Sequence, residues 1–141
     1  MSPIGAAEAF ERAPLLAERV GEGDVETVTA RARAILDGMT DAERVAVLNA
    51  HPRIGATAGL SARSAAEQGG ETDADTLRAL EILNAEYERT FGFRFVVFVH
   101  GRSRAELVPV LQARLRRTRR EELATGIEEF LAIARDRLTR G

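Results

Sequence analysis

The residues best suited to chemistry lie in one stretch, Asn49 to Gly70, which interrupts an otherwise helix-rich sequence. This stretch contains His51, one of only two histidines in the chain, and Pro52 follows it directly. Histidine titrates near neutral pH and can therefore deliver a proton during a reaction. Because proline pushes the preceding residue out of the helical region, Pro52 fixes the direction in which the chain leaves His51.

A hydroxyl, a carboxylate and an amide follow within five positions of one another, in Ser64, Glu67 and Gln68. A carboxylate beside an imidazole would hold its tautomer and stabilise its protonated form, so His51 and Glu67 are a candidate acid–base pair. Both residues also have simpler structural interpretations. His51 could end a helix, where it complements the helix dipole, and Ser64-Ala65-Ala66-Glu67 matches a capping box. The spacing alone leaves both interpretations open.

Composition limits the classes of function. A length of 141 residues suits one domain, residues 1–141, and a net charge of −2 gives no general attraction for nucleic acid or an anionic membrane. The basic run Arg114–Arg120 has no interleaved aromatic residues, which favours a solvated loop offset by Glu121 and Glu122 over an RNA-binding site. Cysteine is absent, and two histidines without paired spacing give no metal signature.

No signal for export or membrane insertion is apparent. The longest apolar run, Phe95–Val99, is far shorter than the roughly 20 residues that a membrane-spanning helix requires. Residues 1–5 lack the charged and apolar regions of a signal peptide. We therefore expect a cytoplasmic protein with no membrane partner.

The elements that must position these residues are predicted to be helices. Asp24 stands at a predicted N-cap, and Thr40, Ser103 and Thr118 each open a capping box. Apolar residues at three- and four-residue spacing predict one buried face for each helix. The segment 7–20 is also predicted to be helical, with an interruption at Pro14.

One segment does not follow the helical pattern. Residues 95–99 are β-branched or aromatic, which predicts an extended backbone, and no second strand is evident to pair with them. The sequence therefore predicts an all-α fold, a single-domain helical bundle of about seven helices with one short extended segment at about residues 94–99.

Five motifs occur in order and together resemble one family, the OHCU decarboxylases, which act on 2-oxo-4-hydroxy-4-carboxy-5-ureidoimidazoline (OHCU). The motifs are Ala50-His51-Pro52-Arg53-Ile54-Gly55, Ser64-Ala65-Ala66-Glu67-Gln68, Leu83-Asn84 with Tyr87, Phe91-Gly92-Phe93 followed by residues 95–99, and Gly101-Arg102-Ser103. The resemblance covers about residue 5 to residue 139. It implies an all-helical fold, usually a homodimer, with no metal and no organic cofactor. It also implies the last step of urate breakdown, in which OHCU loses CO2 and gives (S)-allantoin.

The resemblance also implies roles for individual residues. His51 matches the family's catalytic proton-transfer residue, and we expect Glu67 to orient it. Pro52 matches an adjoining substrate contact, and the remaining substrate-binding residues fall into three groups. They are Ser64, Ala65, Ala66, Glu67 and Gln68; Phe95, Val96, Val97, Phe98 and Val99, through their backbone groups; and Ile133 with Arg137. From its sequence context alone, Arg137 would be a surface arginine of the last helix.

The chain departs from the family pattern in three places. Many members have HPDLA where this chain has HPRIG, and they often have proline where this chain has Arg94. Some members have Cys-Ala-Arg where this chain has Phe98-Val99-His100. The sequence leaves His100 open between a structural cap near the helix at Ser103 and a residue of the pocket.

The chemistry of decarboxylation fits these expectations. Loss of CO2 leaves an electron pair on carbon, and the conjugated ring of OHCU can absorb it without a cofactor. Backbone N–H groups of an unpaired extended segment could stabilise the developing oxyanion. A proton from His51 would then complete the product on one face. The alternative is a non-catalytic helical module that binds a ureide or a partner protein.

Overall fold

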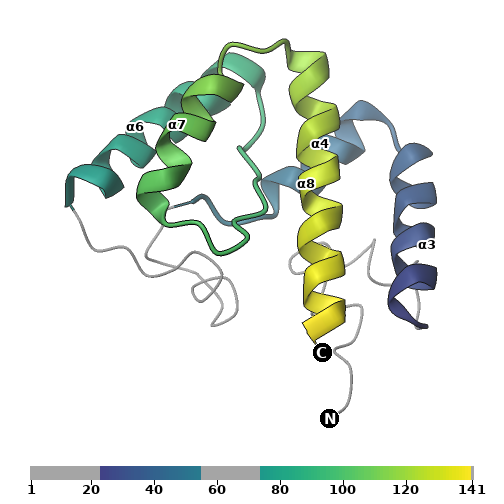
Figure 1. Cartoon of the computed structure of the whole chain (residues 1–141). Helices are drawn as coiled ribbons and strands as arrows, with labels where there is room; N and C mark the ends of the chain where they lie inside the picture. Colours follow the sequence, from purple (N-terminus) through teal and green to yellow (C-terminus); the bar gives the residue numbers. More distant parts are fainter. Residues whose placement is uncertain (1–22, 55–73, 141) are drawn as a thin grey trace.

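The computed structural model describes residues 23–54 and 74–140. These ranges contain five helices: α3 Val25–Asp37, α4 Asp41–Asn49, α6 Ala74–Phe91, α7 Arg104–Arg114 and α8 Arg119–Arg140 (Figure 1). The described part has no β-strand, so the predicted all-helical fold is confirmed, but it contains five helices instead of about seven. The two other predicted helices, over 7–20 and after Ser64, lie outside the described residues.

Local capping starts the helices where the sequence predicts it. The carboxylate of Asp24 accepts a hydrogen bond from the Thr27 N–H at 2.7 Å. Thr40 and Ser103 form complete capping boxes, and Thr118 exchanges the same two bonds with Glu121. These side chains satisfy N–H groups that a helix cannot pair internally. The starts of α3, α4, α7 and α8 are therefore encoded locally.

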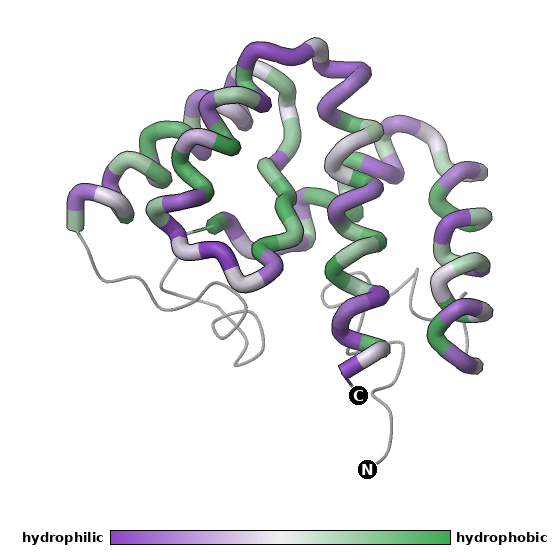
Figure 2. Tube along the Cα trace, viewed as in Figure 1, coloured by the Kyte–Doolittle hydropathy of each residue, from purple (hydrophilic) through white to green (hydrophobic). Residues whose placement is uncertain are grey.

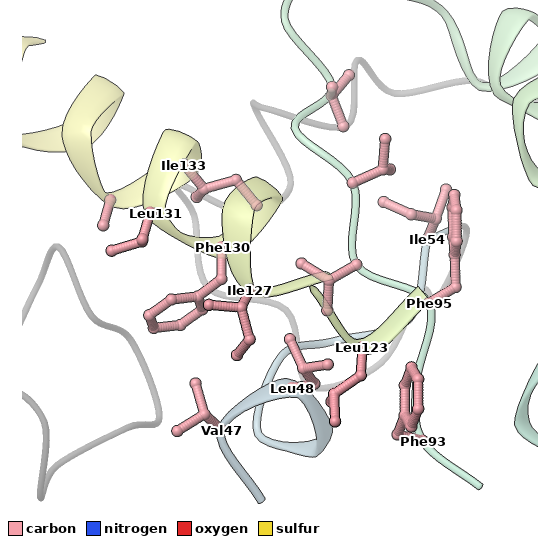
Figure 3. Close-up of a cluster of buried hydrophobic side chains, with 14 of the residues drawn as sticks. Val47, Leu48, Ile54, Phe93, Phe95, Leu123, Ile127, Phe130, Leu131 and Ile133 are labelled. Atoms are coloured by element: carbon pink, nitrogen blue, oxygen red, sulfur yellow. The ribbon is translucent and has the colours of Figure 1, made fainter. Parts of the chain in front are cut away.

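The helices pack in two groups, and the chain that connects α6 to α7 runs between these groups. The α6 and α7 helices pack together, while α3 and α4 both pack against α8 (Figure 1). Residues 94–99 belong to neither a helix nor a strand and pass between the groups. The trace of residues 95–99 is coloured as hydrophobic in Figure 2, and their side chains lie in or against the buried core, of which Figure 3 labels Phe95. The apolar connection is therefore a structural part of the core.

The contact between α4 and α8 depends on a small residue. A Cβ atom at Gly126 of α8 would lie 2.9 Å from Cδ1 of Leu48, a buried residue of α4. This spacing is shorter than an ordinary carbon–carbon contact of about 3.5–4.0 Å. The absence of a side chain at Gly126 therefore allows the two helices to approach each other closely.

A buried ionic cluster joins the two groups of helices. Glu122 of α8 is 0% exposed; it accepts hydrogen bonds from Tyr87 of α6 at 2.6 Å and from Arg114 of α7 at 2.7 Å. Arg117 reaches the second carboxylate oxygen at 2.9 Å. The predicted solvated loop over Arg114–Arg120 is therefore wrong at Arg114, which is buried because its charge is compensated inside the fold.

None of the helices within residues 23–54 and 74–140 is both long and apolar enough to span a bilayer.

Candidate active site

His51 lies buried just beyond the end of α4. Its side chain is 7% exposed, and its N–H donates to the carbonyl of Leu48 at 3.1 Å, which closes the last turn of the helix. The imidazole meets the ring of Phe130 of α8 edge to face, with the ring centroids 5.3 Å apart. Pro52, which follows, is half-buried. The α4 end and α8 together therefore fix the position of this candidate acid.

Two further predicted residues lie on α8 close to Phe130. Ile133 and Arg137 follow Phe130 by three and seven positions, a spacing that places all three on one side of a helix. All three are buried, and Figure 3 shows Phe130 and Ile133 within the apolar cluster. Arg137 is 1% exposed, so its expected surface position is wrong. The tight packing around α8, which sequence spacing does not reveal, buries this guanidinium.

The predicted substrate-binding segment is held along its backbone by side chains. Arg114 donates to the carbonyl of Val96 at 2.7 Å, and its guanidinium lies 4.5 Å from the centroid of the Phe95 ring. The N–H of Phe98 donates to Glu129 of α8 at 3.3 Å, and Arg102 donates to the carbonyl of Phe98 at 2.6 Å. The bonds to α7 and α8 therefore fix this segment on two sides.

The backbone of Val97 differs from that of its neighbours. Val97 is 3% exposed, yet neither its N–H nor its C=O makes a hydrogen bond within residues 23–54 and 74–140. Val96 and Phe98, on either side of Val97, each have a backbone group that forms a hydrogen bond. This alternation is expected, because successive residues of an extended chain direct their backbone groups to opposite edges. Buried backbone groups are normally paired. Among the described residues, the N–H and the C=O of Val97 therefore remain without a hydrogen-bond partner.

The structure brings part of the predicted site together. His51 contacts Phe130 of α8, and the neighbouring Glu129 contacts Phe98. Ile133 and Arg137 lie further along the same helix. Residues Ser64, Ala65, Ala66, Glu67 and Gln68 lie outside the described residues, as does the predicted pairing of Glu67 with His51. Val99 is buried, and its carbonyl accepts bonds from Arg102.

The second histidine lies at the far end of the segment. His100 is exposed, has a φ of 49°, and packs its ring against Phe98 at 4.9 Å between centroids. Gly101 follows with a φ of 76°, so the chain reverses direction in left-handed backbone conformations. His100 thus occupies the turn that leads into α7.

Sequence reasoning missed two residues beside His51. Phe130 lies on the apolar face of the last helix, and this position in the sequence gives no sign of its ring contact to histidine. Arg94 donates through Nη1 to the carbonyl of His51 at 2.9 Å. The signal for Arg94 was its departure from the family's proline, which marks the position as unusual without giving its partner.

A polar pocket of about 230 Å³ adjoins this contact. Six residues line it: Asn49, Arg53, Glu88, Gly92, Phe93 and Arg94. Arg53 forms two hydrogen bonds to Glu88, at 2.6 and 2.9 Å, and this contact raises the pKa of the Arg53 guanidinium. In the part of the chain that the structure describes, no three His, Asp or Glu side chains are arranged to hold a metal ion.

Fold and site together define a helical protein in which a buried histidine is hydrogen-bonded through its backbone to the start of a buried extended segment. The family model described as OHCU decarboxylase matches residues 6–139, and the chain therefore belongs to the OHCU decarboxylase family. This finding confirms the resemblance that the five motifs carry.

Curated relatives agree with this assignment. The chain is 28% identical to 2-oxo-4-hydroxy-4-carboxy-5-ureidoimidazoline decarboxylase of Haloferax volcanii, over 93% of this chain and 83% of the relative. It is 30% identical to the human putative 2-oxo-4-hydroxy-4-carboxy-5-ureidoimidazoline decarboxylase, over 92% and 82% of the two chains. The uric acid degradation bifunctional protein of Bacillus sp. strain TB-90 is 30% identical over 74% of this chain, which spans only 22% of that longer protein.

Solved structures share the fold. A crystal structure of OHCU decarboxylase in the presence of (S)-allantoin superposes with a TM-score of 0.77, at 24% identity over 91% of this chain and 90% of the other. A structure of (S)-allantoin synthase gives a TM-score of 0.73 at 21% identity, over 96% of this chain and 47% of that one.

Proposed function

We propose that this chain converts OHCU to (S)-allantoin and CO2 as a carboxy-lyase that needs no metal or organic cofactor. Membership of the OHCU decarboxylase family and the names of the Haloferax and human relatives support this reaction. The structural observation that carries the proposal is the buried His51, fixed against Phe130 and α8 close to the segment that contains Val97.

The reaction divides into bond cleavage and proton transfer. The C–C bond to the carboxylate breaks, CO2 leaves, and the bonding electron pair passes into the conjugated ring of OHCU. That pair then returns to carbon, where it takes a proton from the imidazole of His51 and forms the new C–H bond. Because His51 is fixed on one side of the ligand, protonation on that face gives a single enantiomer. Glu67 orients the imidazole in this scheme, because a carboxylate beside an imidazole holds its tautomer.

Recognition of the substrate rests on complementary polar groups. A ureide carries N–H donors and C=O acceptors side by side, and Val97 offers one C=O and one N–H that no described residue uses. Hydrogen bonds from a buried backbone to developing negative charge are stronger than they would be in water. The planar guanidinium of Arg137 binds an anionic or carbonyl group of the ligand, next to Ile133. Pro52 and residues 64–68 complete the binding site.

The two histidines allow a controlled test of the proton donor. OHCU is generated in situ from urate by urate oxidase and the hydrolase, and allantoin formation is followed by circular dichroism. We expect His51→Gln to lower kcat by about 10²- to 10⁴-fold and to yield nearly racemic product, since positioned acid catalysis contributes about this much. His100→Gln is the matched control and should keep the wild-type rate, because His100 is exposed in a turn.

Three outcomes would contradict the proposal. Racemic allantoin formed at the uncatalysed rate by the wild-type protein would exclude the decarboxylase function. Enantiopure product at full rate from His51→Gln would exclude His51 as the proton donor. Binding of (S)-allantoin without turnover would indicate a non-catalytic ureide-binding module instead.

Three broader features are part of the same proposal. Residues 1–141 act as one domain, the protein works in the cytoplasm, and it forms a homodimer as the family resemblance implies. Sedimentation velocity at micromolar concentration tests the dimer, for which a monomer would be the contrary result.

A further inference from the structure

Two parts of the candidate site are distant in sequence and must be held together by tertiary contacts. His51 ends the α4 region, and the segment 94–99 begins 43 residues later. Arg94, the first residue of the segment, forms hydrogen bonds to two residues at the end of the α4 region. Its Nη1 donates to the carbonyl of His51 at 2.9 Å, and its backbone N–H donates to Oδ1 of Asn49 at 2.9 Å.

The His51 carbonyl is well placed to use such a bond. It lies beyond the last residue of α4, where carbonyl groups have no partner within the helix. A hydrogen bond from a guanidinium is shorter and roughly twice as strong as a neutral one. The contact is partly buried, so competition from water is reduced. His51 is therefore fixed through its backbone by Arg94 and through its ring by Phe130.

We propose that Arg94 is a positioning residue for proton transfer: it ties the backbone of His51 to the start of the substrate-binding segment and so sets the placement of the imidazole relative to Val97. This inference rests on the proposed function. The family often has proline at this position, and proline has neither a guanidinium nor a backbone N–H. The two bonds made by Arg94 are therefore a feature of this chain's own sequence.

The same pocket supplies a matched control. Arg53 lies two positions after His51 and lines the pocket with Arg94, but its guanidinium bonds to Glu88 of α6. Both arginines depart from the family pattern, and only Arg94 bonds to the His51 backbone. Arg53→Met therefore removes a similar charge and side chain but leaves the hydrogen bond between Arg94 and the His51 carbonyl in place.

The test compares Arg94→Met, Arg94→Lys and Arg53→Met with the wild-type protein. Substrate is generated in situ, and the enzyme concentration is raised until the uncatalysed decay of OHCU is negligible. The enantiomeric excess of the allantoin then reports only the enzymatic reaction. We expect Arg94→Met to lower kcat by about 10- to 100-fold, because a misplacement of about 1 Å has effects of this size. The enantiomeric excess should fall with kcat, while KM stays close to wild type because the ligand-binding groups remain.

Arg94→Lys should recover part of the loss in kcat and part of the loss in enantiomeric excess, since an ammonium can still donate to the His51 carbonyl. Arg53→Met should match the wild type in both quantities. Wild-type kcat and enantiomeric excess in Arg94→Met would overturn the inference. A rate loss with unchanged enantiomeric excess and no recovery in Arg94→Lys would also overturn it, because that pattern is a general loss of folded protein, which thermal unfolding would confirm. Absence of turnover in the wild type would instead reject the proposed function, before any variant is compared.

Discussion

Arg137 is the residue whose environment differs most from what its neighbours in the sequence indicate. The nearby Arg135 and Arg140 are exposed and pair with Glu26 and Asp136, whereas Arg137 is buried among the apolar residues of α8. Burying a guanidinium carries a desolvation cost of several kcal/mol unless hydrogen bonds compensate for it. Under the proposed function, this planar guanidinium binds an anionic or carbonyl group of the ligand.

We expect Arg137→Met to weaken binding of (S)-allantoin and to raise KM by about 10- to 100-fold, because a hydrogen bond to a charged group contributes about 1.5–3 kcal/mol. Isothermal titration calorimetry with (S)-allantoin measures the change in affinity. Arg135→Met is the control and should bind as the wild type does, since its guanidinium is exposed. Unchanged affinity in folded Arg137→Met would remove Arg137 from the binding site.

At the scale of the elements, α8 organises the candidate site. It packs against both α3 and α4, and it presents Phe130 to His51 and Glu129 to the segment 94–99. Its position relative to α4 depends on Gly126, where Leu48 occupies the space that a side chain would need. A change in this contact would shift His51 relative to Phe130.

Gly126→Ala is therefore expected to destabilise the protein although alanine favours helices. Overpacking a core contact costs about 1–3 kcal/mol, which exceeds or cancels the gain of about 1 kcal/mol in helix propensity. Gly38→Ala is the control: its Cβ would lie 3.6 Å from the nearest atoms and its φ is −83°, so its free energy of unfolding should not decrease. Urea unfolding compares the two, and a more stable Gly126→Ala would show that α4 and α8 can separate without cost.

At the scale of the whole molecule, one ionisable group controls stability in alkali. The chain has one tyrosine, no cysteine and arginine as its only basic side chain besides histidine, so Tyr87 is the one side chain whose ordinary pKa lies between about 9 and 12. Burial, and then the hydrogen bond to Glu122, raise the pKa of the Tyr87 phenol above its ordinary value of 10.0. The folded state therefore favours the neutral phenol.

This raised pKa makes folding sensitive to high pH. The stabilising contribution is complete below pH 10, where Tyr87 of the unfolded chain is still neutral, and it is lost as pH rises above that value. We expect the free energy of unfolding to fall by about 1.4 kcal/mol per pH unit there. Urea unfolding between pH 8 and 11.5 measures the slope, and Tyr87→Phe should abolish it. Tyrosinate absorbance that appears near pH 10 in the folded protein would contradict the prediction.

The sequence by itself determined the helix starts, the family and the candidate acid. Capping side chains bond to N–H groups only three residues away, so Thr40 and Ser103 could be recognised from local spacing. His51 was found because Pro52 and the following motif mark it within one short stretch. These properties depend on neighbours along the chain.

The tertiary structure alone decided which groups meet. Arg94 bonds to a carbonyl 43 residues away, Arg137 is buried by packing around α8, and Arg114 is compensated by Glu122 inside the protein and not in a solvated loop. That the backbone of Val97 has no hydrogen-bond partner among the described residues follows only from the tertiary structure, which gives the partners of Val96 and Phe98. Burial and pairing between distant segments depend on how the helices pack, and this packing cannot be derived from the spacing of residues along the chain.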